Sequence, residues 1–140
     1  MVAANIDEAP RLVSTAPVFQ VADVAATMRW YEEHLGFEAF PFPAAPPHAF
    51  CVLVQGAIEI MLQRVEGQPK LDVYRQRPGG VWHAYIRMEG VEELYRRLRG
   101  RPEVVMLEPI KRQPYGDTEF VIADPDGHAL VFSELISDSQ

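Results

Sequence analysis

The chain has 140 residues, a common size for one domain, and 48% of them are hydrophobic and 24% charged, which excludes a disordered or fibrous protein. Its 20 acidic and 13 basic residues give a formal net charge of −7 at pH 7, whereas a nucleic-acid-binding protein would show the opposite sign or a basic stripe. No apolar run is long enough for a transmembrane helix, and no secretory signal is evident. We therefore expect a cytoplasmic protein that has a small-molecule ligand and no nucleic-acid or membrane partner.

The first half of the chain is predicted to form one strand, one helix and then three strands. Asp23 is a good N-cap for the helix, and Gly36 is suited to end it. The helix has apolar residues on one face, at Val24, Met28, Tyr31 and Leu35. The predicted strands lie at residues 13–21, 37–42, 49–54 and 57–63.

The second half of the chain repeats this order. Its helix has an apolar face at Val91, Leu94, Tyr95 and Leu98, and it is expected to end near Gly100. Its strands are predicted at residues 81–88, 104–110, 118–123 and 128–134. The sequence Asp-Pro-Asp-Gly at 124–127 is a strong turn between the last two strands.

Repetition of the same element order indicates a duplication, in which Val24 and Val91 open the two helices. We predict an α+β fold in which two βαβββ modules form a curved mixed sheet, a cup with the helices on its convex side. The chain is interpreted as a single domain over residues 1–140. Module one spans about 12–65, a linker spans 66–80, and module two spans about 81–136.

Alternation along the strands predicts which side chains face the helices and which line the cup. In strand 57–63, the apolar set of Ile58, Ile60 and Leu62 is assigned to the helix side, which leaves Glu59, Met61 and Gln63 in the cup. In strand 81–88, the helix side is assigned to Trp82, Ala84, Ile86 and Met88, which leaves His83, Tyr85 and Arg87 in the cup. In the last strand, Leu130 and Phe132 are assigned to the helix side, and Val131 and Ser133 to the cup.

Three segments carry a resemblance to a known family: APVFQVADVAATMRWYEEHLGFE, WHAYIRMEGVEELYRRL and QPYGDTEFVIADPDGHALVFSE. They resemble the glyoxalase/bleomycin-resistance/extradiol-dioxygenase superfamily, which has the vicinal oxygen chelate fold. The resemblance covers about residues 13–134 and is closest to the bleomycin-resistance branch. That branch implies a homodimer that holds ligands in clefts lined by both subunits.

Enzymes of this superfamily hold a divalent metal on the first and fourth strands of both modules. Carried over, the resemblance places Ala16, Glu59, His83 and Val131 at the four ligand positions. Alanine and valine have no donor atom, and a catalytic metal normally keeps three protein ligands. We therefore expect no metal and no other cofactor, and Glu59 and His83 are the only candidates if a divalent ion binds.

Two functions stay open from the sequence. The first is a non-catalytic protein that binds a small molecule, such as a cationic or aromatic antibiotic, with Tyr115 in the QP-aromatic-G loop as the stacking residue. The other residues expected to bind this ligand are Glu59, His83, Tyr85, Arg87, Met61 and Phe50. The second is a metal-dependent lyase, isomerase or dioxygenase that uses Glu59 and His83, or a metal-free variant in which these two residues act as base and acid.

Three further residues are given structural interpretations. His48, in the proline-rich loop, and His128, just after the predicted turn, are expected to be solvated. Cys51 is the only cysteine, which excludes an internal disulfide, and we expect it to be a small buried hydrophobic residue.

Overall fold

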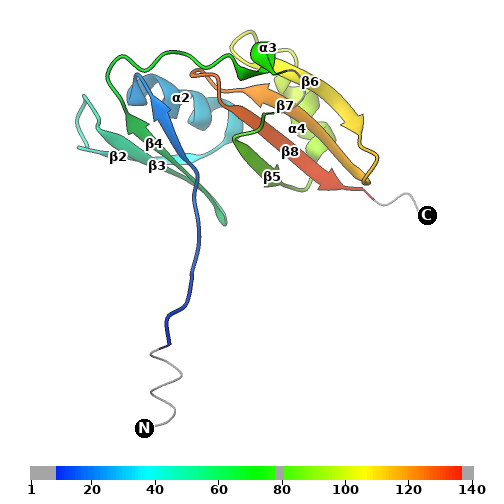
Figure 1. The fold of residues 1–140 in the computed structure, drawn as a ribbon, viewed down its shortest axis with the longest axis horizontal. Coiled ribbons are helices and arrows are strands. Elements are labelled where there is room, and N and C mark those ends of the chain that lie inside the picture. Colours follow the sequence, from blue (N-terminus) through cyan, green and yellow to red (C-terminus); the bar gives the residue numbers. More distant parts are fainter. Residues whose placement is uncertain (1–8, 78–80, 137–140) are drawn as a thin grey trace.

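The fold consists of two four-stranded sheets with two long helices on one side. The structure is a computed structural model that describes residues 9–77 and 81–136. Its elements in chain order are β1 (Val18–Val21), α2 (Val24–Leu35), β2 (Glu38–Phe42), β3 (Phe50–Gln55), β4 (Ile58–Arg64), α3 (Val73–Gln76), β5 (Ala84–Arg87), α4 (Val91–Leu98), β6 (Val105–Arg112), β7 (Asp117–Ala123) and β8 (Ala129–Leu135) (Figure 1). Within this described part of the chain, no helix is long and apolar enough to cross a membrane.

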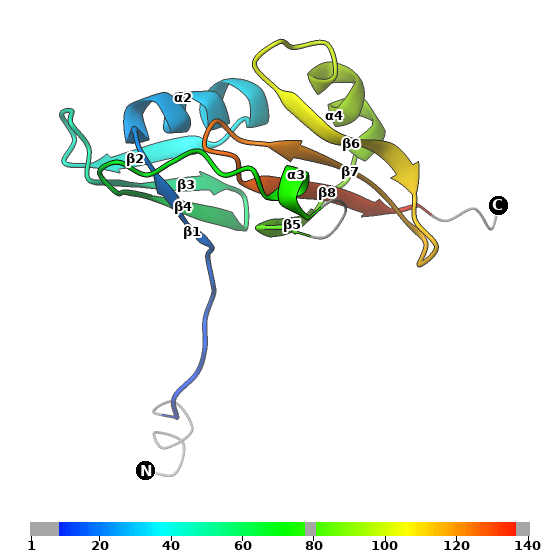
Figure 2. The ribbon, with the colours of Figure 1, turned by 45° about the horizontal axis from the view of Figure 1, so that its top comes forward.

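The two sheets have the same topology. The strand orders are β1-β4-β3-β2 and β5-β8-β7-β6, and in each sheet the first strand is parallel to the last strand of its module. The remaining pairs are antiparallel. Figure 2 shows α2 and α4 on the same side of the sheets, with α3 over the opposite side of the second one. The predicted α+β class and the two βαβββ modules are confirmed.

The two long helices begin by different means. The carboxylate of Asp23 accepts the N–H of Ala26 at 3.2 Å, and Gly36 ends α2 with φ of 73°, so both predicted boundaries of this helix are confirmed. Helix α4 has no side-chain cap of its own. Instead Glu134 Oε1, on β8, accepts the N–H groups of Gly90 and Val91 at 2.9 and 3.0 Å. The start of α4 is therefore stabilised by a residue more than forty positions away.

One continuous core joins the two modules. Tyr31 of α2, Leu62 of β4, Leu98 of α4 and Leu130 of β8 are all fully buried in it. The predicted helix-facing residues Ile60, Leu62, Leu130 and Phe132 all belong to this core. Burial of Cys51 is also confirmed, because its side chain is inaccessible to solvent.

The Asp-Pro-Asp-Gly turn between β7 and β8 packs against module one. Asp126 accepts the backbone N–H of Ala22 at 3.2 Å and the hydroxyl of Thr27 at 2.6 Å. Asp124 accepts the phenol of Tyr31 at 2.7 Å, and burial together with this carboxylate raises the pKa of Tyr31. The predicted turn is thus also the principal polar contact between the two modules.

The same turn holds the linker. Leu71 donates its N–H to the carbonyl of Asp126 at 2.8 Å. Gly127 has φ of 91°, and a Cβ added there would lie 2.1 Å from the carbonyl oxygen of Leu71. Only glycine therefore allows the linker to lie this close to the turn.

Candidate ligand-binding site

The face of the second sheet opposite the helices carries a cluster of hydroxyl and carboxylate groups. The Tyr85 hydroxyl lies 2.8 Å from Asp117 Oδ2, 2.7 Å from Glu119 Oε2 and 2.9 Å from Ser133 Oγ. Strand alternation brings these groups together. Glu119 of β7 is paired with Ser133 of β8. Tyr85 of β5 is paired with Val131, which lies two residues before Ser133 and on the same face of β8. We refer to Tyr85, Asp117, Glu119 and Ser133 as the acidic cluster.

Hydrogen bonds and burial shape the ionisation of the acidic cluster. Hydrogen bonds from Tyr85 and Ser133, followed by the nearby charge of Arg87, lower the pKa of Asp117. Burial and contact with Glu119 raise the pKa of Tyr85 above its ordinary value. The cluster therefore holds an ionised carboxylate next to a phenol that keeps its proton. Such a surface favours the binding of a cation.

Aromatic side chains border the acidic cluster. The hydroxyl of Tyr115 donates to Glu119 Oε1, and burial with this carboxylate raises the pKa of Tyr115 to about 12. The rings of Trp82 and Tyr85 are 5.5 Å apart at 45°, and the indole N–H of Trp82 donates to the hydroxyl of Tyr74 at 3.0 Å. Tyr115 is 57% exposed and Trp82 is 47% exposed, so both have aromatic surface available to a ligand.

The assignment of Trp82 to the helix side was wrong. Its indole contacts Tyr85 and Tyr74 on the opposite side of the sheet. Strand β5 begins only at Ala84, after a bend at His83. Because residue 82 precedes the strand, strand alternation does not extend to it.

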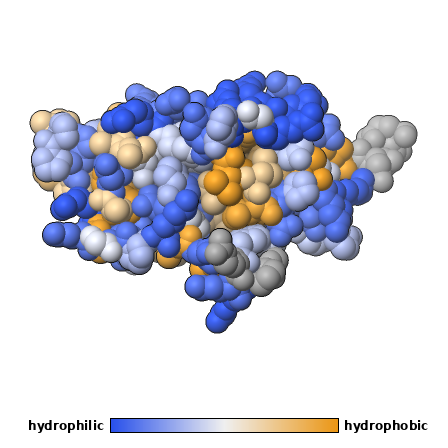
Figure 3. All heavy atoms as spheres, turned by 90° about the horizontal axis from the view of Figure 1, so that it is seen from above, coloured by the Kyte–Doolittle hydropathy of each residue, from blue (hydrophilic) through white to orange (hydrophobic). Residues whose placement is uncertain are grey.

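Two hollows flank the ring of Tyr74 on this face. One, of about 230 Å³, is lined by Trp82, Glu108 and Glu119 among others. The other, of about 410 Å³, is lined mainly by apolar residues of the linker and of strands β6 and β7: Leu71, Val73, Val105, Leu107 and Ala123. Figure 3, which looks down from the top of Figure 1, shows an apolar hollow near the middle of this view. The linker thus contributes to the walls of both hollows.

The structure divides the predicted ligand-binding residues between the two sheets. Tyr85 and Tyr115 lie together at the acidic cluster. Arg87 joins them, with Nη1 3.1 Å from Asp117 Oδ2 and its guanidinium carbon 5.4 Å from the centre of the Tyr85 ring. The other predicted residues on strands of the first sheet are Glu59, Met61 and Phe50, which lie on its face opposite the helices. Within one chain they belong to a separate surface.

His83 is held in contacts within the protein. Its Nδ1 accepts the N–H of Ala129 at 2.9 Å, and its ring meets the rings of Phe19 and His128 edge-on. Burial, followed by the neighbouring His128, lowers the pKa of His83. The neutral ring therefore carries its proton on Nε2, and in this tautomer neither nitrogen has a free lone pair.

The residues at the family's metal positions do not fit a metal. Ala16 and Val131 have no donor atoms, Glu59 lies on the first sheet, and Nδ1 of His83 accepts the N–H of Ala129. Across residues 9–77 and 81–136, no group of three or more His, Cys, Asp or Glu side chains is arranged to hold an ion. We therefore derive no chemistry through a metal.

The predictions that His48 and His128 are solvated were wrong. His128 is 4% exposed, its ring stacks on Phe19 at 4.3 Å, and its Nδ1 lies 3.0 Å from both oxygens of Asp124. His48 is also buried, with Nδ1 2.8 Å from the carbonyl of Pro43. Both rings are buried by neighbouring residues of the folded chain. The position of each histidine near a turn in the sequence does not predict this burial.

The lowered pKa of His83 gives a prediction for stability. The unfolded chain takes up the proton near the ordinary value of 6.5, above the pH at which the folded protein does. The free energy of unfolding should therefore fall as the pH is lowered from 7.5 to 5. In the variant His83→Asn, whose side-chain oxygen can accept the Ala129 N–H without titrating, the fall should be shallower. Urea denaturation at several pH values measures both, and equal slopes would contradict this role of His83.

Comparison with known proteins places this chain in a family. Residues 11–132 match the model of the Glyoxalase/Bleomycin resistance protein/Dioxygenase superfamily. The chain belongs to this superfamily. Virulence protein STM3117 of Salmonella typhimurium is 29% identical over 125 residues, which cover 85% of this chain and 81% of that protein. The resemblance predicted from the three sequence segments is thus confirmed.

Solved structures of other proteins share the fold of this chain. TioX from Micromonospora sp. ML1 superposes with a TM-score of 0.70 at 18% identity, over 89% of this chain and all of TioX. The bleomycin-binding protein of Streptomyces verticillus, solved with copper(II)-bleomycin, superposes with a TM-score of 0.61 at 22% identity, over 89% of this chain and 97% of that one. At these identities the likeness establishes the fold alone.

Sequence reasoning missed Asp117, Glu119 and Tyr74. A signal for Glu119 was present, because strand alternation places it on the same side as Val121, opposite Phe120. The predicted strand began at Thr118, so Asp117 was outside it. Tyr74 reaches the site only because the linker folds over the second sheet, and no local pattern predicts that.

Proposed function

We propose that this superfamily member binds a small molecule with a planar aromatic part and a cationic group, without catalysis and without a metal. The observation that carries this proposal is the position of Glu119. Its side chain is 3% exposed, its Oε1 accepts the hydroxyl of Tyr115, and its Oε2 lies 2.7 Å from the Tyr85 oxygen, beside a hollow that Trp82 also lines. A cationic group that reaches this carboxylate is stabilised by charge, while the aromatic rings contact the planar part.

We propose that the protein is a homodimer, as the resemblance to the bleomycin-resistance branch implied. Support comes from the open face of the first sheet, which exposes Val18 by 54%, Phe40 by 52%, Phe42 by 68% and Phe50 by 40%. Apolar surface gathered on one face is typical of an interaction site. A second copy packed there would also bring Glu59, Met61 and Phe50 of one chain toward the ligand of the other. The expected partner is therefore a second copy of this chain.

The enzymatic alternative stays a prediction without support from the site. It required Glu59 and His83 to act together, as metal ligands or as base and acid. Glu59 lies on β4, whereas His83 precedes β5 and accepts the Ala129 N–H. The acidic cluster, in contrast, unites residues of three strands in one place.

Binding of planar cations tests the proposed function. We expect proflavine, a planar aromatic cation, and metal-free bleomycin to raise the melting temperature, and the anion acridine-9-carboxylate to leave it unchanged. Glu119→Gln should weaken proflavine binding about 10- to 100-fold, since a hydrogen bond to a charged group contributes about 1.5–3 kcal/mol. Tyr115→Ala should weaken it by about two- to fivefold through loss of the cation–π contact. Titration calorimetry measures the affinities, and sedimentation of the complex should give two chains and one ligand per chain.

Glu92→Gln is the matched control, because Glu92 lies exposed in the first turn of α4, on the opposite side of the sheet. It removes the same charge from the protein and should leave the affinity for proflavine within twofold of wild type. Equal affinities for Glu119→Gln and Glu92→Gln would contradict the proposed site. Turnover of a thiol–aldehyde adduct or a catechol would contradict the absence of catalysis.

A further inference from the structure

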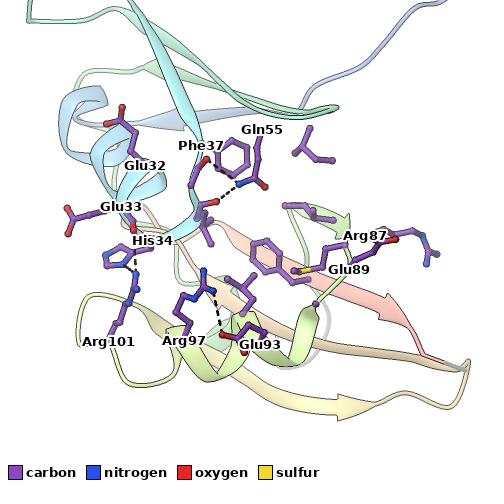
Figure 4. A pocket seen from close by; sticks show the side chains of 18 residues that line it. Glu32, Glu33, His34, Phe37, Gln55, Arg87, Glu89, Glu93, Arg97 and Arg101 are labelled. Atoms are coloured by element: carbon purple, nitrogen blue, oxygen red, sulfur yellow. Dashed lines mark hydrogen bonds and ion pairs between the residues drawn. The ribbon is translucent and has the colours of Figure 1, made fainter. Parts of the chain in front are cut away.

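A third hollow lies on the helix side of the sheets, where the two modules meet. It has a volume of about 460 Å³ and lies between the end of α2 and the start of α4 (Figure 4). Part of its lining is apolar, formed by Phe37, Ile58, Ile86, Met88, Leu94 and Phe132, and the rest is polar or charged. We refer to this hollow as the intermodule groove. It is distinct from the acidic cluster, which lies on the opposite face of the second sheet.

Basic side chains form one end of the intermodule groove. Arg101 donates to the carbonyl of Glu33 at 3.4 Å and lies 3.1 Å from Nδ1 of His34. Arg97 has a longer contact, with Nη2 3.5 Å from Glu93, whose other oxygen is bound by Arg96 at 2.7 Å. Because Glu93 is shared between two arginines, its charge only partly compensates Arg97.

The local charge differs from that of the whole chain. Residues 96–101 read Arg-Arg-Leu-Arg-Gly-Arg, a basic run within a protein of net charge −7. Four acidic residues line the groove, and one of them, Glu93, is paired with Arg97. In Figure 4, Glu32 and Glu33 point away from the groove, whereas the guanidinium group of Arg97 points into the space between the helices. An anion at this end of the groove therefore meets positive charge first.

We propose that the intermodule groove binds an aliphatic carboxylate. The carboxylate lies against Arg97, with Arg101 and His34 nearby, and the hydrocarbon chain covers Phe37 and Leu94. Guanidinium groups bind carboxylates through charge-assisted hydrogen bonds, and the apolar walls gain from removal of the chain from water. The amide of Gln55 donates to the carbonyls of Leu35 and Gly36 at 2.7 and 3.2 Å. It thereby covers the negative end of α2, which would otherwise repel the anion.

A ligand in this position contacts both modules at once. Phe37 and Ile58 belong to module one, whereas Arg97 and Leu94 belong to module two. Such a ligand binds the folded chain and has no equivalent site in the unfolded chain. Its binding should therefore raise the stability of the whole protein in proportion to the logarithm of its concentration.

Titration with decanoate tests this proposal. Wild-type protein should bind one decanoate per chain in calorimetry, with amide NMR shifts at Gly36 and Gly90. Arg97→Gln should weaken this binding about tenfold. Arg99→Gln is the matched control, since it removes the same charge from the same basic run, and Arg99 lies with its guanidinium carbon 5.9 Å from the centre of the Tyr95 ring and does not line the groove. It should change the affinity by less than twofold.

Three outcomes would overturn the proposal. The first is the absence of saturable decanoate binding to the wild-type protein. The second is an equal loss of affinity in Arg97→Gln and Arg99→Gln, which would indicate a general charge effect. The third is a loss of decanoate binding in Trp82→Ala with NMR shifts at the acidic cluster. Because Trp82 and the groove are on opposite sides of the sheet, failure here is distinguishable from failure of the proposed function.

Discussion

Gly127→Ala should lower the free energy of unfolding by about 3 kcal/mol or more. The left-handed backbone costs a non-glycine residue about 1–2 kcal/mol, and overpacking in a tight site adds about 1–3 kcal/mol. Both costs apply here, because φ is 91° and the new Cβ would lie 2.1 Å from the carbonyl oxygen of Leu71. Backbone atoms form this obstacle, so the clash is relieved only by moving the linker off the turn.

Gly56→Ala is the matched control for this prediction. Gly56 also has positive φ, 57°, but a Cβ there would have no neighbour within 4 Å. The control should therefore cost only the conformational part, about 1–2 kcal/mol. Urea denaturation followed by circular dichroism measures both variants. Equal losses of unfolding free energy in the two variants would show that the linker moves away from the turn at little cost and that its contact with the turn is weak.

Asp124→Ala should destabilise the protein by about 3–5 kcal/mol, as expected when one partner of a buried charged network is removed. The carboxylate is 2% exposed and accepts the phenol of Tyr31, a ring nitrogen of His128, and the backbone N–H groups of Asp126 and His128. Truncation leaves these donors without their acceptor in a buried place. The hydrogen bond between Tyr31 and Asp124, one of the contacts between the two modules, is lost as well.

Two variants with smaller expected effects serve as comparisons for Asp124→Ala. Tyr31→Phe removes one hydrogen bond to the same carboxylate and should cost about 1 kcal/mol. Asp23→Ala removes an exposed aspartate that caps α2, and it should also cost about 1 kcal/mol. Thermal and urea unfolding of the three variants gives the comparison. A loss in Asp124→Ala no larger than in Asp23→Ala would show that the buried network contributes little.

These two positions also bear on ligand binding. Asp124 and Gly127 belong to the turn that joins β7 and β8, and these strands carry Asp117, Glu119 and Ser133 of the acidic cluster. Both variants should reduce binding by reducing the folded fraction. The molecules that stay folded should bind with the affinity of the wild type.

Local patterns predicted the elements of this fold well. The cap at Asp23 and the stop at Gly36 act within one helical turn, so the sequence around them contains the whole signal. The alternation of Ile60 and Leu62 with Met61 also depends only on the strand itself. Repetition of these local signals along the chain was sufficient to predict the two βαβββ modules.

The candidate site could be predicted only in part. Tyr85 and Arg87 follow from alternation within β5, and Tyr115 from its loop. Tyr74 and Trp82 come together through the fold of the linker: Tyr74 lies in the four-residue helix α3, and Trp82 precedes β5. Because no periodic pattern applies to such a segment, sequence reasoning assigned Trp82 to the wrong side and missed Tyr74.

By itself, the sequence determined the two long helices, the strands, the duplication and the family of this protein, because each of these depends on contacts between residues close in the chain or on a repeated pattern. The short helix α3 (Val73–Gln76) lies in the segment that was predicted to be a linker. The tertiary structure decided the roles of the polar side chains. Asp126 bonds to Ala22, 104 residues away, and His83 bonds to the backbone of Ala129, 46 residues away. The packing of two distant segments determines a hydrogen bond of this kind, and the local sequence around either partner does not predict it.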